Sequence, residues 1–167
     1  EHRELLATWA QLLTPGGTLA FQVPGNFEAP SHRIIREVAA AQPRGAELTS
    51  AFRHDRPVDD PADYAEQLGA VGLTPDCWET TYVQLLDPAG ELANPVLDWV
   101  KGTALRPLLD LLTGPDERAA FLADLDAALL SAYPRGPLGV AFPFRRIFAV
   151  ASRSAAPDAP QPARSMQ

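Results

Sequence analysis

Apolar residues recur at helical spacing at the start of the chain and then form a short continuous run. Residues 4–13 place leucines and a tryptophan three and four positions apart, which predicts a helix with one apolar face. The turn Pro15-Gly16-Gly17 ends it, because proline cannot continue a helix and glycine adopts backbone angles that other residues avoid. The apolar run 19–23 then favours a strand, which Pro24-Gly25-Asn26 ends.

Two more helices are predicted before the middle of the chain. The first begins at Pro30-Ser31, continues with an apolar face of isoleucine, valine and alanine, and ends before Pro43. The charged residues of 44–59 follow no period, which predicts a polar surface loop. The second helix begins at Asp60-Pro61 and closes near Gly72.

The second half of the chain repeats the change between strand and helix. Residues 77–86 alternate with period two and are rich in aromatic and β-branched side chains, which favours a strand. Residues 93–112 predict a helix with Pro107 as a kink or break. A second helix follows it, and its predicted core face is Phe121, Leu125, Ala128, Leu129 and Ala132. The run 142–151 predicts a final strand with Pro143 at its start.

This order of elements predicts an α/β fold. Strands alternate with helices along the chain, and we expect one domain over residues 1–153. The last two strands can lie side by side while the helices between them, at about residues 93–133, form a cap above the edge of the sheet. Such a cap is a candidate wall of a functional site. Residues 154–167 are rich in alanine, proline, serine and glutamine, which is typical of a disordered tail.

Composition narrows the classes of function. The chain of 167 residues has 14 Lys+Arg against 21 Asp+Glu, a net charge of −7, so long-range attraction to nucleic acid or to an anionic membrane is not expected. The single cysteine, Cys77, excludes intrachain disulfides and a multi-cysteine zinc site, and the three histidines lack the spacing of metal ligands. No apolar run reaches the roughly 18 residues of a membrane helix. We therefore expect a cytoplasmic protein without a metal.

Short strings along residues 1 to about 153 resemble a known family. In chain order they include Leu12-Leu13, Pro15-Gly16-Gly17, Gln22-Val23-Pro24, Arg36-Glu37-Val38-Ala39, Trp78-Glu79-Thr80-Thr81-Tyr82, Asp98-Trp99-Val100, Leu105-Arg106-Pro107 and Ala141-Phe142-Pro143. Together they resemble the C-terminal part of the class I S-adenosylmethionine-dependent methyltransferases, and among these the enzymes that methylate a carboxylate of trans-aconitate. The resemblance implies a Rossmann-like sheet, S-adenosyl-L-methionine as the cofactor of the complete enzyme, and a methyl ester as the product.

The family's cofactor-binding segments have no counterpart in this chain. Gly16-Gly17 precedes a predicted strand, whereas the family's Gly-rich loop follows one. The resemblance therefore implies that the cofactor-binding residues lie upstream of residue 1 and that the isolated chain is inactive. Two alternatives stay open: a methyltransferase for another small acceptor, and an inactive truncated binding module.

The implied reaction needs no general base. A carboxylate with a pKa of about 4 is already ionised at neutral pH, so no catalytic residue is expected, and the rate comes from positioning and from removal of water. Binding a small polycarboxylate does need cations, and arginine binds carboxylates through a planar fork. An arginine on the reacting carboxylate would reduce its nucleophilicity, so arginines are expected on the other carboxylates.

Seven residues are candidates for binding this substrate. Arg106 leads, because it is a charged residue on an otherwise apolar helix of the cap, although a solvent-exposed arginine or one paired with Asp98 or Asp110 is an alternative. Gln22 and Asn26 stand at the C-terminal end of a strand interpreted as parallel, where open α/β sheets place their ligands. The full set, each member of which also has a structural interpretation, is Arg106, Tyr82, Asn26, Arg33, Arg146, Trp99 and Gln22. A site for a tricarboxylate requires the side chains of Arg106, Arg33 and Arg146 to converge on one place.

Overall fold

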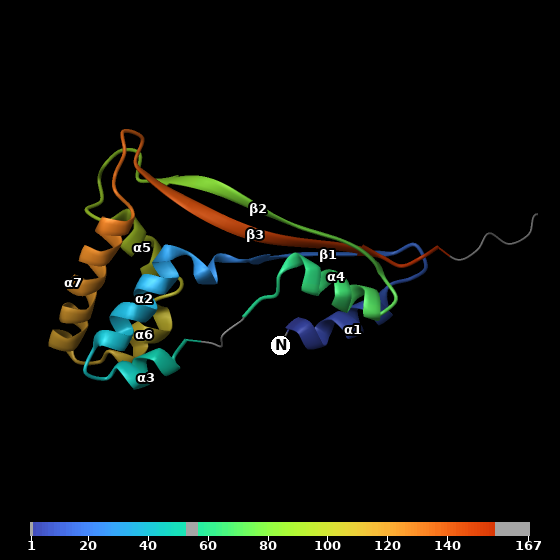
Figure 1. Ribbon diagram of the computed structural model, residues 1–167, viewed down its shortest axis with the longest axis horizontal. Helices are drawn as coiled ribbons and strands as arrows, with labels where there is room; N and C mark the ends of the chain where they lie inside the picture. Colours follow the sequence, from blue (N-terminus) through green and yellow to red (C-terminus); the bar gives the residue numbers. More distant parts are fainter. Residues whose placement is uncertain (1, 53–56, 156–167) are drawn as a thin grey trace, which may run out of the picture. The chain divides into compact units, whose positions relative to one another are not determined.

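The computed structural model describes residues 2–52 and 57–155. Seven helices, three strands and one 3₁₀ turn are found in these residues (Figure 1). In chain order they are α1 (His2–Leu12), β1 (Thr18–Pro24), η1 (Asn26–Glu28), α2 (Pro30–Ala41), α3 (Gly45–Ser50), α4 (Pro61–Ala70), β2 (Thr74–Leu86), α5 (Pro95–Lys101), α6 (Arg106–Leu111), α7 (Pro115–Ala132) and β3 (Val140–Ser152). The tail expected over 154–167 lies outside the described residues from 156 onwards.

The prediction of a polar surface loop over residues 44–59 is wrong in part. The segment contains α3, and Leu48 of this helix is completely buried. A six-residue helix is too short to show a hydrophobic period, so the sequence pattern gave no sign of it. Asp59 is also buried, at 8% exposure, because an arginine holds its carboxylate. Residues 53–56 of this predicted loop lie outside the described residues.

The cap between the last two strands consists of three helices. The single helix predicted over residues 93–112 is two helices, α5 and α6, with a turn between them. Pro107 lies in the first turn of α6. It has no N–H to donate to the carbonyl four residues before it, so one helix could not continue through this point. Pro107 thus marks the break that the sequence suggested.

The three strands form an antiparallel sheet with the order β1-β3-β2. The backbone N–H of Gly25 donates to the carbonyl of Arg145, and that of Arg153 donates to the carbonyl of Gly17, so β1 and β3 run in opposite directions. β2 and β3 are neighbours, as predicted. The interpretation of β1 as a strand with a parallel neighbour is wrong for the described sheet, because the neighbour it has, β3, is antiparallel.

Pro143 lies inside β3, which begins three residues earlier at Val140. Arg145 directs its backbone N–H and C=O towards the β1 side of the strand. Alternate residues of a strand direct these groups to the same side, so the nitrogen of Pro143 also points there. β1 ends at Pro24. Pro143 therefore occupies a central strand without removing a hydrogen bond between strands.

The chain divides into two compact units, and β2 and β3 contribute residues to both. Unit 1 comprises residues 1–23, 59–79 and 147–167, and unit 2 comprises residues 24–58 and 80–146. In unit 1, α1 and α4 are in contact, and the core includes Leu6 and Tyr64 from these helices and Ile147 from β3. Among the residues that the structure describes, no helix has the length and hydropathy of a membrane span.

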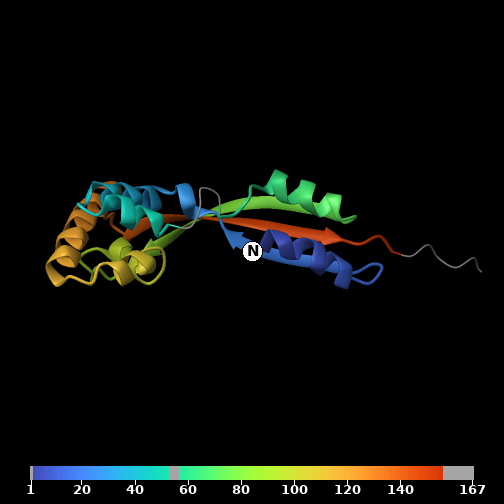
Figure 2. The ribbon, with the colours of Figure 1, turned by 90° about the horizontal axis from the view of Figure 1, so that it is seen from below.

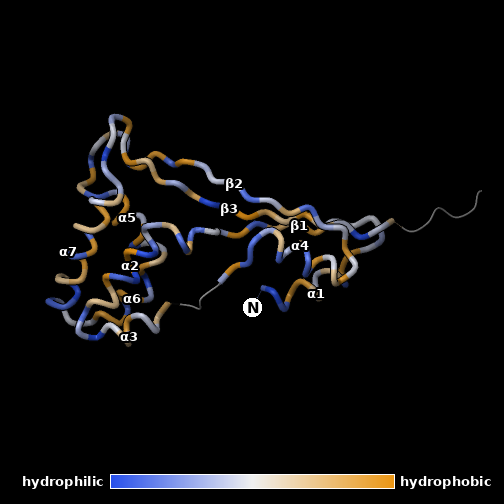
Figure 3. Tube along the Cα trace, viewed as in Figure 1, coloured by the Kyte–Doolittle hydropathy of each residue, from blue (hydrophilic) through white to orange (hydrophobic). Residues whose placement is uncertain are grey.

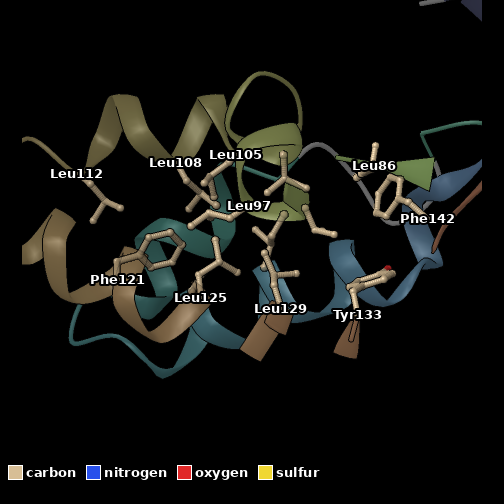
Figure 4. Close-up of a cluster of buried hydrophobic side chains, with 14 of the residues drawn as sticks. Leu86, Leu97, Leu105, Leu108, Leu112, Phe121, Leu125, Leu129, Tyr133 and Phe142 are labelled. Carbon is tan, nitrogen blue, oxygen red and sulfur yellow. The ribbon is translucent and has the colours of Figure 1, made fainter. Parts of the chain in front are cut away.

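Unit 2 holds the larger hydrophobic core. Its α7 contacts both α2 and α5, and the α2–α3 and α5–α6 pairs are seen as separate groups in Figure 2. Figure 4 shows leucines of α5 and α6 opposite Phe121 and Leu125 of α7. Along α7 the hydropathy alternates (Figure 3), and Phe121, Leu125 and Leu129 are fully buried as the sequence pattern predicted. This core fixes the helices on which the cleft described next is built.

Candidate functional site

Unit 2 contains a cleft of about 1080 Å³. It is lined by residues from η1, α2, the end of α3, α5 and the turn after it, and β3 between Phe142 and Arg146. Sites for small molecules commonly span roughly 300–1,000 Å³, so the cleft has room for a small ligand. All of its lining residues belong to unit 2.

One wall of the cleft is aromatic. Phe142 and Phe144 lie on the same face of β3, and their ring centroids are 6.3 Å apart. The indole of Trp99, on α5, is 6.1 Å from the ring of Phe142 and 6.0 Å from that of Phe144. Aromatic rings of this kind exclude water, and charge interactions beside them are therefore strengthened.

Arg146 continues the face of β3 that carries these rings. Its guanidinium carbon lies 4.9 Å from the centroid of the Phe144 ring, which is a cation–π contact. The ring fixes the position of the positive charge at the cleft. This geometry suits the binding of an anionic ligand group against an apolar wall.

A second guanidinium reaches the cleft from α2. Nη1 of Arg36 donates to the carbonyl oxygen of Phe27 at 2.7 Å. Nη2 of Arg36 lies 3.3 Å and 3.5 Å from the two carboxylate oxygens of Glu28, whose side chain is 77% exposed. Arg36 is therefore held firmly by a backbone carbonyl and loosely by a solvent-exposed carboxylate.

Asn26 lies where β1 has just ended, and it is 7% exposed. Its side-chain oxygen accepts a hydrogen bond from the backbone N–H of Arg145 at 2.6 Å, so the side chain extends the pairing of β1 with β3. Because the oxygen is fixed by this donor, the amide nitrogen is fixed as well, and it makes no hydrogen bond with the described residues. Asn26 lines the cleft and can offer this nitrogen as a donor.

His32 lies one helical turn before Arg36 and also lines the cleft. Burial lowers the pKa of His32 from its ordinary value, and the nearby Arg36 lowers it further, while Glu28 opposes both. The imidazole is therefore neutral at neutral pH. A neutral imidazole can donate one hydrogen bond and accept another, so His32 adds a polar group to the cleft without adding charge.

The cleft brings together three of the seven residues predicted from the sequence: Asn26, Trp99 and Arg146. Arg106 is exposed at the first residue of α6 and does not line the cleft, although the adjacent Pro107 does. Arg33 is exposed on α2 and also lies outside the cleft lining. The predicted Arg106, Arg33 and Arg146 thus do not converge on the cleft. The second arginine that lines it, beside Arg146, is Arg36.

The other two predicted residues lie on strands. Tyr82 of β2 is 44% exposed, with its ring centroid 5.7 Å from that of Phe144, and it does not line the cleft. Gln22 is exposed on β1 and belongs to unit 1. Both residues are therefore outside the site that the cleft defines.

Sequence reasoning missed Arg36 and His32. The signal that could have found them is the spacing of four residues, which places both on one face of α2 and leaves Arg33 on another. In the described residues no three His, Cys, Asp or Glu side chains gather as metal ligands do. The site is a partly apolar cleft with two guanidinium groups, one carboxylate and neutral polar groups.

Comparisons with known proteins find similarity to several proteins named trans-aconitate 2-methyltransferase. No family model matches the chain. A trans-aconitate 2-methyltransferase of Streptomyces avermitilis is 52% identical over 154 residues, which are 92% of this chain and 55% of that protein. Proteins of the same name from Rhodococcus jostii and Methylobacterium nodulans are 52% and 44% identical and cover 90% and 92% of the chain, which spans 58% of each. The chain spans about half the length of the curated relatives it matches.

Proposed function

We propose that this chain, which belongs to the trans-aconitate 2-methyltransferases and spans about half their length, provides the acceptor-binding part of such an enzyme. In the proposed reaction S-adenosyl-L-methionine supplies an electrophilic methyl group, and a carboxylate oxygen of trans-aconitate takes it to give a methyl ester. The observation that carries the proposal is the cleft of unit 2, which places Arg36 and Arg146 beside aromatic rings.

The charge of the cleft supports an anionic acceptor. The chain as a whole carries a net charge of −7, which disfavours an anion at long range. Of the charged side chains that line the cleft, two are arginines and one is a glutamate. The cleft is thus locally positive, within a chain that is acidic overall.

Each cleft residue has a defined part in binding. Arg146 holds a carboxylate that does not react, because an arginine on the reacting oxygen would lower its nucleophilicity. The amide nitrogen of Asn26 donates a hydrogen bond to the acceptor. Trp99, Phe142 and Phe144 exclude water from the carboxylate that reacts, which removes the hydration that would otherwise stabilise its charge. No proton is transferred, so none of these residues acts as an acid or a base.

We assign no residue of this chain to the cofactor. The glycines of the Gly16-Gly17 turn precede β1. A Gly-rich loop that holds a nucleotide follows a strand and opens a helix, so the turn does not fit this role. The proposal for the chain therefore concerns the acceptor alone.

Calorimetric titration of the chain with trans-aconitate, cis-aconitate and citrate tests this proposal. We expect trans-aconitate to bind, and Arg146→Gln to weaken its binding about tenfold, because a charge-assisted hydrogen bond is lost. Arg118→Gln is the matched control, since Arg118 is an exposed arginine of α7 outside the cleft. Equal affinity for all three acids would favour another acceptor, and equal loss in both variants would exclude the cleft as the binding site.

A further inference from the structure

A carboxylate of the chain already occupies Arg36 in the cleft. The two oxygens of Glu28 lie 3.3 Å and 3.5 Å from Nη2 of Arg36, which is longer than the roughly 2.7–2.9 Å of a charge-assisted hydrogen bond. The Glu28 side chain is 77% exposed, so water competes for both of its oxygens. Ion pairs of this kind contribute little to stability. This contact is therefore easily exchanged.

The other half of the Arg36 guanidinium is fixed. Its Nη1 donates to the carbonyl oxygen of Phe27 at 2.7 Å, and Phe27 lies in η1 beside the cleft. The ring of Phe27 is 5.7 Å from the His32 ring, one turn before Arg36 on α2. The guanidinium can therefore lose Glu28 without losing its position, and Nη2 remains available to another carboxylate.

We propose that Arg36 forms a second carboxylate subsite, which Glu28 fills when no ligand is bound and leaves when a di- or tricarboxylate binds. The inference rests on the proposed function of the cleft, because it assigns a further contact to the same ligand. Arg146 binds one carboxylate of the ligand and Arg36 binds another. Glu28 is a resident competitor, so its removal strengthens binding and the removal of Arg36 weakens it.

The chemical class of the ligand follows from the two arginines. A monocarboxylate has one anionic group, and it binds at Arg146, where the ring of Phe144 offers a contact to the apolar part of the ligand. A polycarboxylate held at Arg146 presents its next carboxylate to Arg36 at a high effective concentration, which offsets the loss of the Glu28 contact. The subsite therefore contributes to binding of di- and tricarboxylates and not of monocarboxylates.

Fluorescence of Trp99 provides a readout of the cleft. The chain has three tryptophans, and Trp99 is the one that lines the cleft. The substitutions Trp9→Phe and Trp78→Phe remove the other two tryptophans, so that the fluorescence comes from Trp99. Circular dichroism checks that the doubly substituted chain stays folded. Titrations with trans-aconitate and with crotonate, a monocarboxylate, are then compared in this background, with calorimetry of the unsubstituted chain in parallel.

A double-mutant cycle separates the subsite from a general effect of charge. Glu28→Gln should tighten trans-aconitate binding about two- to fivefold, the range of an exposed ion pair. Arg36→Gln should weaken it about tenfold and leave crotonate binding unchanged. In the Arg36→Gln background, Glu28→Gln should give no gain, because its effect acts through Arg36. Glu37 is an exposed residue of α2, the helix that carries Arg36, and lies outside the cleft. Glu37→Gln should therefore change neither the affinity for trans-aconitate nor that for crotonate.

The outcomes distinguish the subsite from the proposed function. Trans-aconitate binding that depends on Arg146 but not on Arg36 would overturn the subsite and leave the proposed function standing. An equal gain from Glu28→Gln and Glu37→Gln, or a gain that persists without Arg36, would also overturn it. Absence of binding by any carboxylate would remove both proposals. Glu28 is exposed, so Glu28→Gln tests the idea even where Arg36→Gln impairs folding.

Discussion

Arg3 of unit 1 and Arg36 of unit 2 both lie on helices and both face a carboxylate. Nε and Nη2 of Arg3 lie 2.6 Å and 2.9 Å from the two oxygens of Asp59, and the amide of Gln67 donates to the same carboxylate at 2.9 Å. The Asp59 side chain is 10% exposed. The contacts of Arg36 with Glu28 are longer, at 3.3 Å and 3.5 Å, and the carboxylate is exposed.

The difference separates an arginine that builds the fold from one that can bind a ligand. In unit 1 the carboxylate is buried and has several donors, so breaking the pair leaves an uncompensated charge. In unit 2 the carboxylate is hydrated, and another carboxylate can replace it at little cost. Arginine content alone therefore does not locate a carboxylate site. The burial of the partner and the lengths of the contacts do.

The largest expected effect is on the stability of unit 1. Arg3→Gln should lower the free energy of unfolding by about 2 kcal/mol, because Asp59 stays buried after losing two charge-assisted hydrogen bonds. Arg36→Gln should lower it less, by about 1 kcal/mol, since the hydrogen bond to the carbonyl oxygen of Phe27 is lost while water replaces the exposed Glu28 contact. Urea unfolding followed by circular dichroism measures both. Equal losses would show that Arg36 is as structural as Arg3, and the contrast between the units would not hold.

A smaller effect is expected where one residue serves both the fold and the cleft. Asn26→Asp keeps an oxygen that accepts from the N–H of Arg145, so the fold is retained, but the second oxygen replaces the donor that faces the ligand. Repulsion should then weaken trans-aconitate binding by about tenfold, or roughly 1.4 kcal/mol. Thr18→Asp places the same new charge on β1 in unit 1 and should leave binding unchanged.

If the two variants weaken binding equally, the effect comes from net charge and not from the cleft. If Asn26→Asp instead unfolds the chain, the contact with Arg145 tolerates no charge, and Asn26→Ser becomes the variant to titrate. Its hydroxyl oxygen still accepts a hydrogen bond, and it removes the amide donor without adding charge.

Most helices and strands were predictable because their apolar residues are periodic. The buried Phe121, Leu125 and Leu129 of α7 follow a spacing of four, and the period-two run of β2 gave a strand. The short α3 shows no period, and the break between α5 and α6 depends on Pro107. Arg106 does lie on an apolar helix of the cap, but at the first residue of α6 and exposed, so its charge carries no cost of burial and needs no ligand.

The site was less predictable, because its residues meet only in the folded chain. Arg33 and Arg36 are three positions apart on α2, and the sequence does not say which face of that helix borders a cleft. Asn26 was open between a turn and a ligand contact; in the structure its side-chain oxygen accepts from the N–H of Arg145, and the residue lines the cleft. Arg146 was expected at the start of the last strand, but β3 begins at Val140 and Arg146 lies within it, and its ring contact with Phe144 was not foreseen.

The smallest expected effect is the dependence of stability on pH that His32 introduces into unit 2. Burial lowers the pKa of His32, Arg36 lowers it further, and Glu28 opposes them. In the unfolded chain the imidazole titrates near its ordinary pKa of about 6.5. Because the folded pKa lies below this value, the unfolded state binds more protons as the pH falls through about 6.5. The contribution of His32 to stability is complete above this pH and is lost as the pH falls towards the folded pKa.

His32→Gln removes this titration and keeps a neutral polar side chain in the cleft. We expect the unfolding free energy of the unsubstituted chain, relative to that of the variant, to decrease as the pH is lowered from about 7 to about 5. Arg36→Gln should make this decrease in unfolding free energy smaller, because His32 keeps its proton more easily in the folded state once the neighbouring cation is removed. Urea unfolding at each pH measures the three chains side by side. A relative stability that rises towards pH of about 5 would mean that His32 is charged in the folded chain, and the cleft would then hold a third cation instead of a neutral donor and acceptor.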